Sequence, residues 1–332
     1  MTRVLLTGAA GFAGSHCLRH ILETTDWTIV CPVTFSHRGV PQRIVSAVDP
    51  GKLHRVHVVK ADLSAPVGRI TAESFGEIDY IVNYASESHV DRSIVDPVGF
   101  VSNNVALILQ LLEYARQARP KMFVQVSIDE VYGPAPMGYA HQEWDPVIPS
   151  NPYSASKAAQ EAIAVAYWRT YGIPVVLLNA MNLIGEMQDG EKYLPLVIGR
   201  LLRGEVVPVH ASPDGIVGAR HYIHARNLAD AIMFLLDRDV AMHNDGADRP
   251  DRFHIVGEVE TDNLTLARMV ADILGKPLRH ELVDFHASRP GHDLRYALDG
   301  KKMAGLGWTA PVEFEESLRK TVLWTLEHPI WL

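Results

Sequence analysis

Four side chains in two short stretches of the sequence have types and spacings suited to catalysis. Tyr153 and Lys157 lie four residues apart, so on a helix they share one face. An ammonium beside a phenol favours phenolate, which lets a tyrosine of reference pKa about 10 act as a base towards a carbinol. Asp129 and Glu130 follow a predicted buried strand, 123–127, and such a carboxylate pair suits removal of water from neighbouring carbons. The two pairs together favour an enzyme that oxidises a sugar, dehydrates it and reduces it again.

A glycine-rich turn near the start of the chain predicts a dinucleotide site. Gly8, Gly11 and Gly14 lie between a predicted strand and a predicted helix. Glycine lets the backbone approach a pyrophosphate closely, and the start of the helix offers unpaired N–H groups to the phosphates. We therefore predict that this loop, with Phe12 and Ala13, binds a cofactor.

The elements that must position these residues alternate along the chain. Apolar runs predict strands at 4–6, 27–31, 56–59, 80–82, 123–126 and 175–178. Helical patterns lie between them, clearest at 101–118 and 154–171. This alternation predicts an α/β fold with a doubly wound parallel sheet, the Rossmann architecture.

After about residue 179 the pattern becomes less regular. Short strands are expected at 206–209 and 253–256, and helices at 227–236 and 264–274. We predict a smaller C-terminal α/β lobe that binds substrate. The predicted Rossmann domain spans 1–180 plus about 220–240, and the predicted lobe spans 181–219 and 241–332.

The end of the predicted second strand leaves NAD and NADP as alternatives. A carboxylate that binds the adenosine ribose is expected there, but residues 30–38 contain none and the next is Asp49. Ser36, His37 and Arg38 could receive the 2′-phosphate of NADP, or could form an ordinary polar loop. Further cofactor contacts are expected at Asp62, Leu63, Tyr84 and Lys157.

Composition narrows the class of protein. The chain has 332 residues and is 47% hydrophobic, which is enough for one large or two closely packed domains. Its net charge of −8 argues against a nucleic-acid surface. Cys17 and Cys31 form no disulfide framework, which fits a reducing compartment. With no signal peptide and no apolar run of membrane-spanning length, we expect a cytoplasmic protein without membrane contact.

Five stretches, 7–15, 83–93, 129–133, 151–157 and 289–296, carry a family likeness that covers nearly the whole chain. They resemble the extended short-chain dehydrogenase/reductases, and within them the nucleotide-sugar 4,6-dehydratases of the dTDP-glucose 4,6-dehydratase type. The Ser-His-Val-Asp-Arg-Ser and Arg-Pro-Gly-His-Asp runs are more specific than the glycine loop.

This resemblance implies a mechanism for the four side chains. Tyr153 takes the proton of the sugar 4-hydroxyl as hydride leaves C4 for the nicotinamide, while Lys157 lowers the tyrosine pKa and holds the nicotinamide ribose. Glu130 then removes the C5 proton and Asp129 protonates the departing 6-hydroxyl. Hydride returns to C6, so the cofactor ends as it began and should stay tightly bound. Two close carboxylates push their pKa values apart, which allows this division of labour.

One residue departs from the family pattern. Ile128 stands where the family has Thr or Ser, whose hydroxyl bonds both the catalytic phenol and the sugar 4-hydroxyl. Isoleucine can make neither bond, and Ser127 should point to the opposite face of an extended strand. We expect slow hydride transfer, or a substrate that supplies the missing contact.

The resemblance also implies residues that hold a nucleotide-diphosphate sugar. Arg220 matches the family's diphosphate-binding arginine, Arg289 and His292 match positions in the same pocket, and Asn263 matches a nucleotide contact. Other matching positions are Ser86, Asp91, Arg92, Asn182, Glu191, Lys192 and Tyr193. For any single one of these, an ordinary surface contact is the alternative.

Three further expectations concern metals, assembly and competing activities. The sixteen histidines show no metal-ligand spacing, so we expect no metal. The helices at 101–118 and 154–171 resemble those of a four-helix dimer interface in the family, which predicts a homodimer; the alternative is packing within one monomer. A 4-epimerase or decarboxylase on the same scaffold is the competing activity, and Asp129–Glu130 argues against the epimerase. Ile128 alone favours a catalytically impaired nucleotide-sugar binder.

Overall fold

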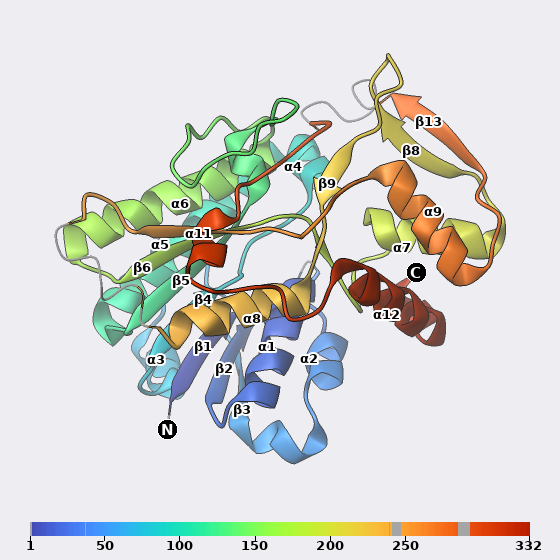
Figure 1. Cartoon of the computed structure of the whole chain (residues 1–332). Coiled ribbons are helices and arrows are strands. Elements are labelled where there is room, and N and C mark those ends of the chain that lie inside the picture. Colours follow the sequence, from blue (N-terminus) through green and yellow to red (C-terminus); the bar gives the residue numbers. More distant parts are fainter. Residues whose placement is uncertain (1, 37, 239, 241–246, 285–292) are drawn as a thin grey trace.

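A computed structural model of the chain describes residues 2–36, 38–238, 240, 247–284 and 293–332. Its centre is a seven-stranded parallel sheet with helices on both faces (Figure 1). The predicted doubly wound α/β fold is confirmed. In spatial order the strands are β11 (Asp251–Ile255), β6 (Val175–Ala180), β5 (Met122–Ile128), β4 (Tyr80–Asn83), β1 (Arg3–Thr7), β2 (Thr28–Val33) and β3 (Val56–Lys60).

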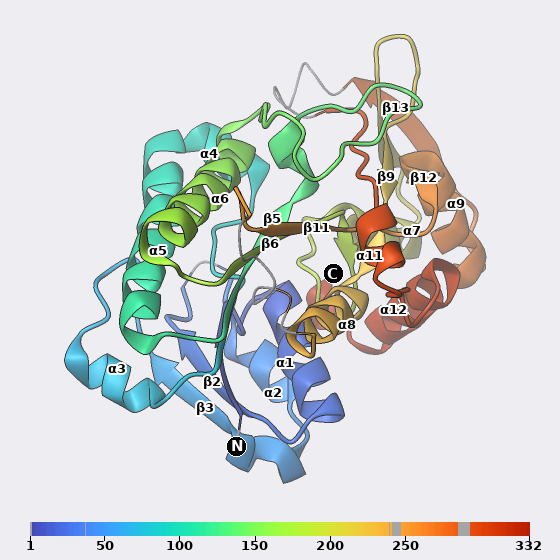
Figure 2. The ribbon, with the colours of Figure 1, turned by 60° about the vertical axis from the view of Figure 1, so that its left-hand side comes forward.

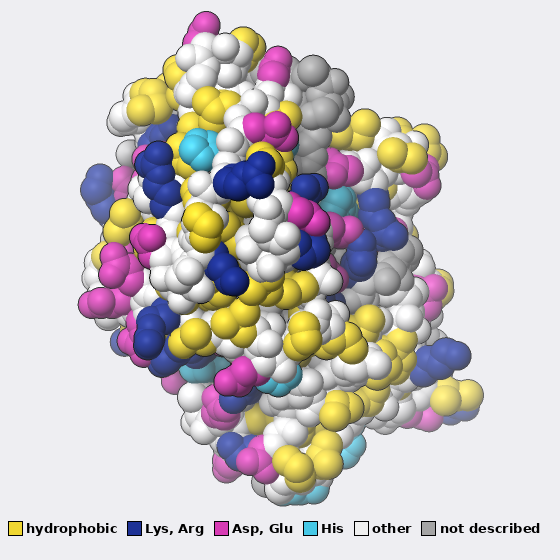
Figure 3. Space-filling model, turned by 90° about the vertical axis from the view of Figure 1, so that its right-hand side faces the viewer, with side chains coloured by type: hydrophobic (Ala, Val, Ile, Leu, Met, Phe, Trp, Pro, Cys, Tyr) yellow, Lys and Arg dark blue, Asp and Glu magenta, His cyan; other side chains and the backbone are white. Residues whose placement is uncertain are grey.

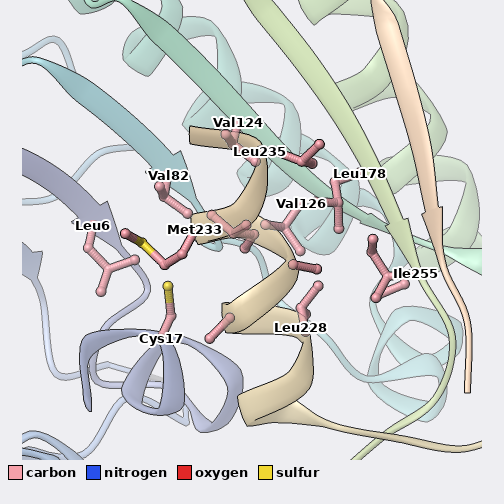
Figure 4. Packing of buried hydrophobic residues seen from close by; sticks show 14 of the residues in the cluster. Leu6, Cys17, Val82, Val124, Val126, Leu178, Leu228, Met233, Leu235 and Ile255 are labelled. Carbon is pink, nitrogen blue, oxygen red and sulfur yellow. The ribbon is translucent and has the colours of Figure 1, made fainter. Parts of the chain in front are cut away.

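The two faces of the sheet bury two separate apolar clusters. Leu6, Val124 and Leu178 belong to the cluster under α1 (Phe12–Thr24), α2 (Pro41–Ala47) and α8 (Ala225–Leu236), seen in Figure 4. Their chain neighbours Leu5, Phe123 and Leu177 belong to the cluster under α3 (Arg69–Phe75), α5 (Pro97–Ala118) and α6 (Pro152–Tyr171). Because successive residues of a strand face opposite sides, a sheet covered on both faces needs unbroken apolar runs.

The start of α6 is specified by its own sequence. The Asn151 side chain accepts a hydrogen bond from the Ser154 N–H, and the Ser154 hydroxyl completes a capping box. Pro152 occupies the first helical turn, where a missing N–H costs nothing. This start places Tyr153 and Lys157 in the first two turns, next to the end of β5.

A separate apolar cluster outside the sheet supports the smaller lobe. Val197, Leu266 and Leu318 pack there, one each from three of the lobe's helices. The lobe contains α7 (Tyr193–Arg203), α9 (Asn263–Leu274) and α12 (Phe314–Glu327), with the paired strands β8 (Val207–Ala211) and β13 (His280–Asp284), β9 (Ala219–His221) and β12 (Glu260–Asp262), and β7 (Leu183–Ile184) and β10 (Ile223–His224). Figure 1 shows this lobe at one end of the sheet, and the short helices α4 (Val90–Val95) and α11 (Lys301–Gly305) complete the elements used below.

The chain crosses between the two parts more often than the predicted boundaries allow. β11 pairs with β6 and forms one edge of the main sheet, so residues 251–255 lie in the sheet and not in the lobe to which they were predicted to belong. The reason is that a short strand pairs with whichever sheet edge is open, which its local sequence does not reveal. α8 packs against α1 on the main sheet, and the remaining domain boundaries stay a prediction.

Helix α5 is longer and more apolar than its neighbours. By length and composition alone it could cross a membrane, so the expectation of no apolar run of that length was wrong. It lies side by side with α6 in Figures 1 and 2, and 39% of its most apolar window is buried inside the described structure. Its inner face contributes Ile108, Leu111 and Leu112 to the core under α6, as expected of a helix that covers a sheet.

Candidate active site

A cavity of about 550 Å³ opens where the central strands end. Its walls come from the segments that follow β1, β2, β3, β4, β5 and β6, together with the start of α6 and the start of the lobe. The carboxyl ends of parallel strands are where open α/β sheets bind their ligands. Of the twelve residues considered for cofactor binding, His37 lies outside the described residues and the other eleven line this cavity: Gly8, Gly11, Phe12, Ala13, Gly14, Ser36, Arg38, Asp62, Leu63, Tyr84 and Lys157.

The glycine loop has the shape that a pyrophosphate requires. Gly8 has a φ of +70°, and the Gly11 N–H donates to its carbonyl at 2.9 Å. A Cβ on Gly14 would lie 2.1 Å from the Gly8 oxygen, so only glycine lets α1 start this close to β1. Gly11 caps α1 without any side-chain hydrogen bond, so the first N–H groups of the helix are not capped by the protein. The loop therefore fits the phosphates of a dinucleotide.

The four predicted catalytic side chains meet in the same cavity. Asp129 and Glu130 begin a single 3₁₀ turn at the end of β5, and Tyr153 and Lys157 face them from α6. The Lys157 ammonium donates to the Val126 carbonyl at 2.8 Å and to Gln160 Oε1 at 2.9 Å. Burial lowers the pKa of Lys157 to about 8, only partly opposed by the charge of Glu161.

The buried amides that hold Lys157 extend across the sheet. Thr7 donates to Asn83, Asn83 to Gln125, and Gln125 to the same Gln160 oxygen that accepts from Lys157. These four polar side chains are at most 1% exposed, and a fully satisfied buried network orients its members strongly. Gln125 was a visible signal, since it is the one amide within the apolar strand β5, but its link to Lys157 was missed.

The pKa of Tyr153 is shifted in the direction opposite to the predicted one. Burial raises its pKa well above the ordinary value, and the charges of Glu130 and Asp129 raise it further. The predicted lowering by Lys157 is not seen, because the ammonium of Lys157 donates to Val126 and Gln160 instead. Among the neighbouring charges, those of the two carboxylates, and not that of Lys157, shift the pKa of this phenol.

The two carboxyls of the acidic pair differ in how their pKa values are shifted, as their chemistry needs. Burial and the charge of Glu130 raise the pKa of Asp129 to about 7. Burial also raises the pKa of Glu130, but a hydrogen bond from Asn151 at 3.3 Å and the charge of Arg220 oppose that rise. Asp129 Oδ2 is buried without a hydrogen-bond partner among the described residues. Asp129 can therefore carry a proton near neutral pH beside an ionised Glu130.

Residues 4–247 match the family described as NAD dependent epimerase/dehydratase. The chain belongs to this family. Membership selects NAD from the two cofactors that the sequence left open.

Members of the NAD dependent epimerase/dehydratase family resemble the chain along nearly its whole length. It is 32% identical to dTDP-glucose 4,6-dehydratase 1 of Escherichia coli (strain K12), covering 99% of this chain and 94% of that protein. A solved dTDP-glucose 4,6-dehydratase of Streptomyces venezuelae, with NAD and a second ligand bound, is 32% identical with a TM-score of 0.86, covering 99% of this chain and 98% of that one. UDP-glucose 4-epimerase of Thermus thermophilus in complex with NAD is 27% identical with a TM-score of 0.81, covering 97% and 98%.

The substrate residues predicted for this family member fall into three groups. Six line the cavity: Ser86, Arg92, Asn182, Glu191, Lys192 and Tyr193. Three do not: Asp91, Arg220 and Asn263. Arg289 and His292 lie outside the described residues.

Arg220 and Asn263 serve the protein's own structure here. The Arg220 guanidinium donates to the carbonyls of Asp293 and Leu294 at 2.6 and 2.5 Å and lies over the Tyr296 ring. Asn263 is buried and accepts hydrogen bonds from the hydroxyls of Tyr222 and Tyr193. In this structure, therefore, neither offers its polar groups to the cavity. A motif match predicts the residue type but not which neighbour it pairs with.

Ile128 lines the cavity beside the acidic pair. It packs against the apolar cluster under α1 and α8 and supplies no hydrogen bond from its side chain. The neighbouring Ser127 also lines the cavity, and its hydroxyl is buried without a partner among the described residues. A hydroxyl is thus present one residue from the position where the family likeness places it.

A second polar cluster lies next to the glycine loop. His16 Nε2 approaches the Glu186 carbonyl at 2.9 Å, and His224 Nε2 approaches Glu186 Oε2 at 3.0 Å. The three could hold a metal ion by distance alone, a grouping that the sequence spacing did not reveal. However, His224 Nδ1 accepts from the Arg226 N–H, which puts the His224 proton on Nε2, where it bonds Glu186. The ring nitrogens that face Glu186 already have partners within the protein.

Proposed function

We propose that the chain is a nucleotide-sugar 4,6-dehydratase. It converts a nucleoside-diphosphate hexose of the dTDP-glucose kind to the 4-keto-6-deoxy sugar, by oxidation at C4, loss of water across C5–C6 and reduction at C6. The observation that carries this proposal is the Asp129–Glu130 pair, with Asp129 buried and Glu130 half-buried, in one cavity with Tyr153 and Lys157. Sugar oxidation alone needs the tyrosine and lysine; water elimination is what needs a second acid and base.

Each side chain has a role that its surroundings support. Bound NAD would supply a hydride acceptor for C4 and then a hydride donor for C6. Tyr153, as the phenolate, would accept the proton of the 4-hydroxyl, and Lys157, held by Val126 and Gln160, would present its charge to the cofactor ribose and to that phenolate. The raised pKa of Tyr153 keeps the phenol protonated at rest, so it must lose its own proton to solvent before it can take that of the substrate. The positive nicotinamide ring of bound NAD would favour that loss.

The carboxyls then divide the elimination between them. Glu130, hydrogen-bonded by Asn151, is the base that takes the C5 proton. Asp129, whose pKa burial and Glu130 raise to about 7, is the acid that protonates the leaving 6-hydroxyl. The charge of Arg220 lowers the pKa of both carboxyls and limits how far burial neutralises the pair.

The test is product analysis on a panel of nucleotide sugars, with dTDP-glucose first, because similar relatives are named for it. Mass spectrometry should show loss of one water from one member of the panel, with no net consumption of cofactor. Turnover of none of them, with nucleotide-sugar binding intact, would reject the dehydratase.

A 4-epimerase is the second candidate. It is favoured by the likeness to the Thermus thermophilus UDP-glucose 4-epimerase, whereas Ile128, which removes the expected hydroxyl, favours only a catalytically impaired binder. An epimerase product has the mass of its substrate, so NMR of the sugar ring distinguishes it where mass spectrometry finds no change. A decarboxylase would instead lose carbon dioxide from a uronate sugar, and an impaired binder would release no product.

We propose further that the protein is a cytoplasmic homodimer. α5 and α6 pack together, and the outer side of α5 leaves Val98 exposed close to its start. A pair of such helices from each subunit would cover this apolar side in a four-helix bundle. Light scattering should give twice the chain mass of 36.8 kDa, and cell fractionation should recover the protein with soluble enzymes.

Interaction with nucleic acid or membranes is not part of this proposal. On the face drawn in Figure 3, Lys and Arg side chains alternate with Asp and Glu, and the described residues there form no uniformly basic surface. Such mixing gives no extended attraction for a phosphate backbone.

A further inference from the structure

The adenosine end of the cavity lacks the carboxylate that usually meets the ribose of NAD. The segment after β2 supplies Val33, Thr34, Ser36 and Arg38 to the cavity wall, and none of these is acidic. Arg38 is the residue type that accommodates the 2′-phosphate of NADP. Taken alone, this segment favours NADP, whereas the family is described by NAD.

A carboxylate reaches the same place from the other side of the cavity. Glu191 precedes α7, at the start of the lobe, and its Oε2 forms an ion pair with the Arg38 guanidinium. Its Oε1 lies 3.1 Å from His89 Nε2. Both oxygens of Glu191 therefore have partners. One partner is Arg38, which is the single cation among the described residues that the segment after β2 places in the cavity wall.

The pairing is built into the scaffold and is not a chance contact of two long side chains. Arg43 on α2 is 1% exposed. Its guanidinium donates to the Arg38 carbonyl at 2.6 Å and to the Met187 carbonyl at 2.9 Å, and it forms an ion pair with Asp189 at 3.0 Å. One buried cation thus anchors both the Arg38 segment and the 187–191 segment, which sets Arg38 opposite Glu191.

We propose that Glu191 determines the preference for NAD over NADP. The ribose of NAD carries a neutral 2′-hydroxyl and has no need of Arg38. The 2′-phosphate of NADP would have to take Arg38 from Glu191 and lie beside a carboxylate that has lost its guanidinium partner. Rossmann proteins usually distinguish NAD from NADP with a residue at the end of the second strand. Here a residue of the substrate lobe does so. The inference rests on the proposed function only in requiring that the cavity binds a nicotinamide dinucleotide.

The test measures bound nucleotide, not turnover. The full-length protein is equilibrated with equal concentrations of NAD and NADP, separated from unbound nucleotide and denatured, and the released cofactors are quantified by chromatography. We expect the parent to hold NAD almost alone. Glu191→Gln should raise the ratio of NADP to NAD by roughly tenfold or more, since it frees one charge-assisted contact.

Two controls separate this effect from general electrostatics. Arg38→Gln combined with Glu191→Gln should lose the gain, because Arg38 is the group that Glu191 releases. Glu87→Gln removes another carboxylate from the cavity wall but leaves the Arg38–Glu191 and Arg43–Asp189 pairs in place, and should not shift the ratio. An unchanged ratio in Glu191→Gln, or an equal shift in Glu87→Gln, would overturn the inference while leaving the proposed function standing. Failure of the parent to bind either nucleotide would reject both.

Discussion

The two halves of the cavity are built in different ways. The cofactor half is made of short contiguous segments at the ends of β1, β2, β3 and β4, and its predicted residues all line the cavity. The substrate half draws on residues far apart in the chain, and two of its predicted polar groups, Arg220 and Asn263, bond other parts of the protein instead. The backbone conformation of a short contiguous segment is set by its own residues, whereas a long side chain can bond any of several partners that only the folded chain brings near.

The halves also differ in what holds them. The cofactor loop depends on backbone geometry, with no room for a Cβ at Gly14. The catalytic half depends on buried charges whose pKa values are moved by burial and by one another. Substitutions should therefore separate the halves, affecting either cofactor retention or the chemical step.

Replacing the base should have the largest effect. We expect Glu130→Gln to lower dehydration by roughly 10²- to 10⁴-fold, the range for loss of one general base. Cofactor retention should be unchanged, and reduced nicotinamide should accumulate when substrate is added, because oxidation at C4 does not need Glu130. Product mass and nicotinamide absorbance measure the two steps. Glu73→Gln on the surface of α3 is the control, and loss of bound cofactor in Glu130→Gln would erase the distinction between the halves.

Closing the glycine turn should damage the other half. In Gly14→Ala the new methyl would meet the Gly8 oxygen at 2.1 Å, so α1 must shift, at a cost of about 1–3 kcal/mol in unfolding free energy. We expect NAD to dissociate during gel filtration and the denaturation midpoint to fall. Gly68→Ala is the matched control, because a Cβ at Gly68 meets nothing within 4 Å. Equal behaviour of the two variants would contradict the packing argument.

The buried acid should make activity and stability depend on pH in the same direction. Asp129 has its pKa raised from 3.8 to about 7. Between these values the unfolded chain releases the proton and the folded protein keeps it, so its contribution to stability is full below the unfolded pKa and is lost as pH rises through about 7. Turnover should fall over the same upper range as the acid is lost. Asp129→Asn should therefore be inactive in dehydration yet more stable than the parent at about pH 8, by an amount on the order of a few kcal/mol.

A second aspartate, Asp145, serves as a control because its pKa is shifted in the opposite direction. Although burial opposes it, hydrogen bonds from Tyr139 and Gln142 lower the pKa of Asp145. Its stabilisation is present above the unfolded pKa and lost as pH falls, so Asp145→Asn should destabilise the protein at about pH 8. Denaturant titrations at about pH 4 and pH 8 measure both variants, and a shift of the same sign in the two would refute the assignment of Asp129.

The smallest expected effect comes from replacing Ile128 in the catalytic half. Ile128→Thr restores a hydroxyl beside the reacting carbinol and should raise turnover on a nucleotide-glucose substrate by roughly threefold to tenfold, the effect of one hydrogen bond. Ile128→Val keeps the shape without the hydroxyl and should not. An unchanged or lower rate in Ile128→Thr would count against the family alignment at this position.

Much of the fold could be predicted because it repeats simple local patterns. All seven strands of the main sheet were expected within a few residues, six of them as members of that sheet, and the capped start of α6 follows from Asn151, Pro152 and Ser154. β11 could not be assigned to that sheet, since a short strand of mixed polar and apolar residues is equally suited to either part of the molecule until β6 offers an edge. α5 begins earlier than its apolar pattern, at Pro97, because Asp96 caps it.

Sequence by itself determined which chemical groups this protein has and the order in which strands and helices present them: the glycine turn, Tyr153 with Lys157, and Asp129 with Glu130. Tertiary structure alone decided how those groups are charged and paired. It raised the pKa of Tyr153, bound Lys157 to Gln160, turned Arg220 to the backbone near Asp293, and placed Glu191 against Arg38. Periodicity and motifs act over a few residues, whereas burial and ion pairing depend on every chain segment that folds around a group.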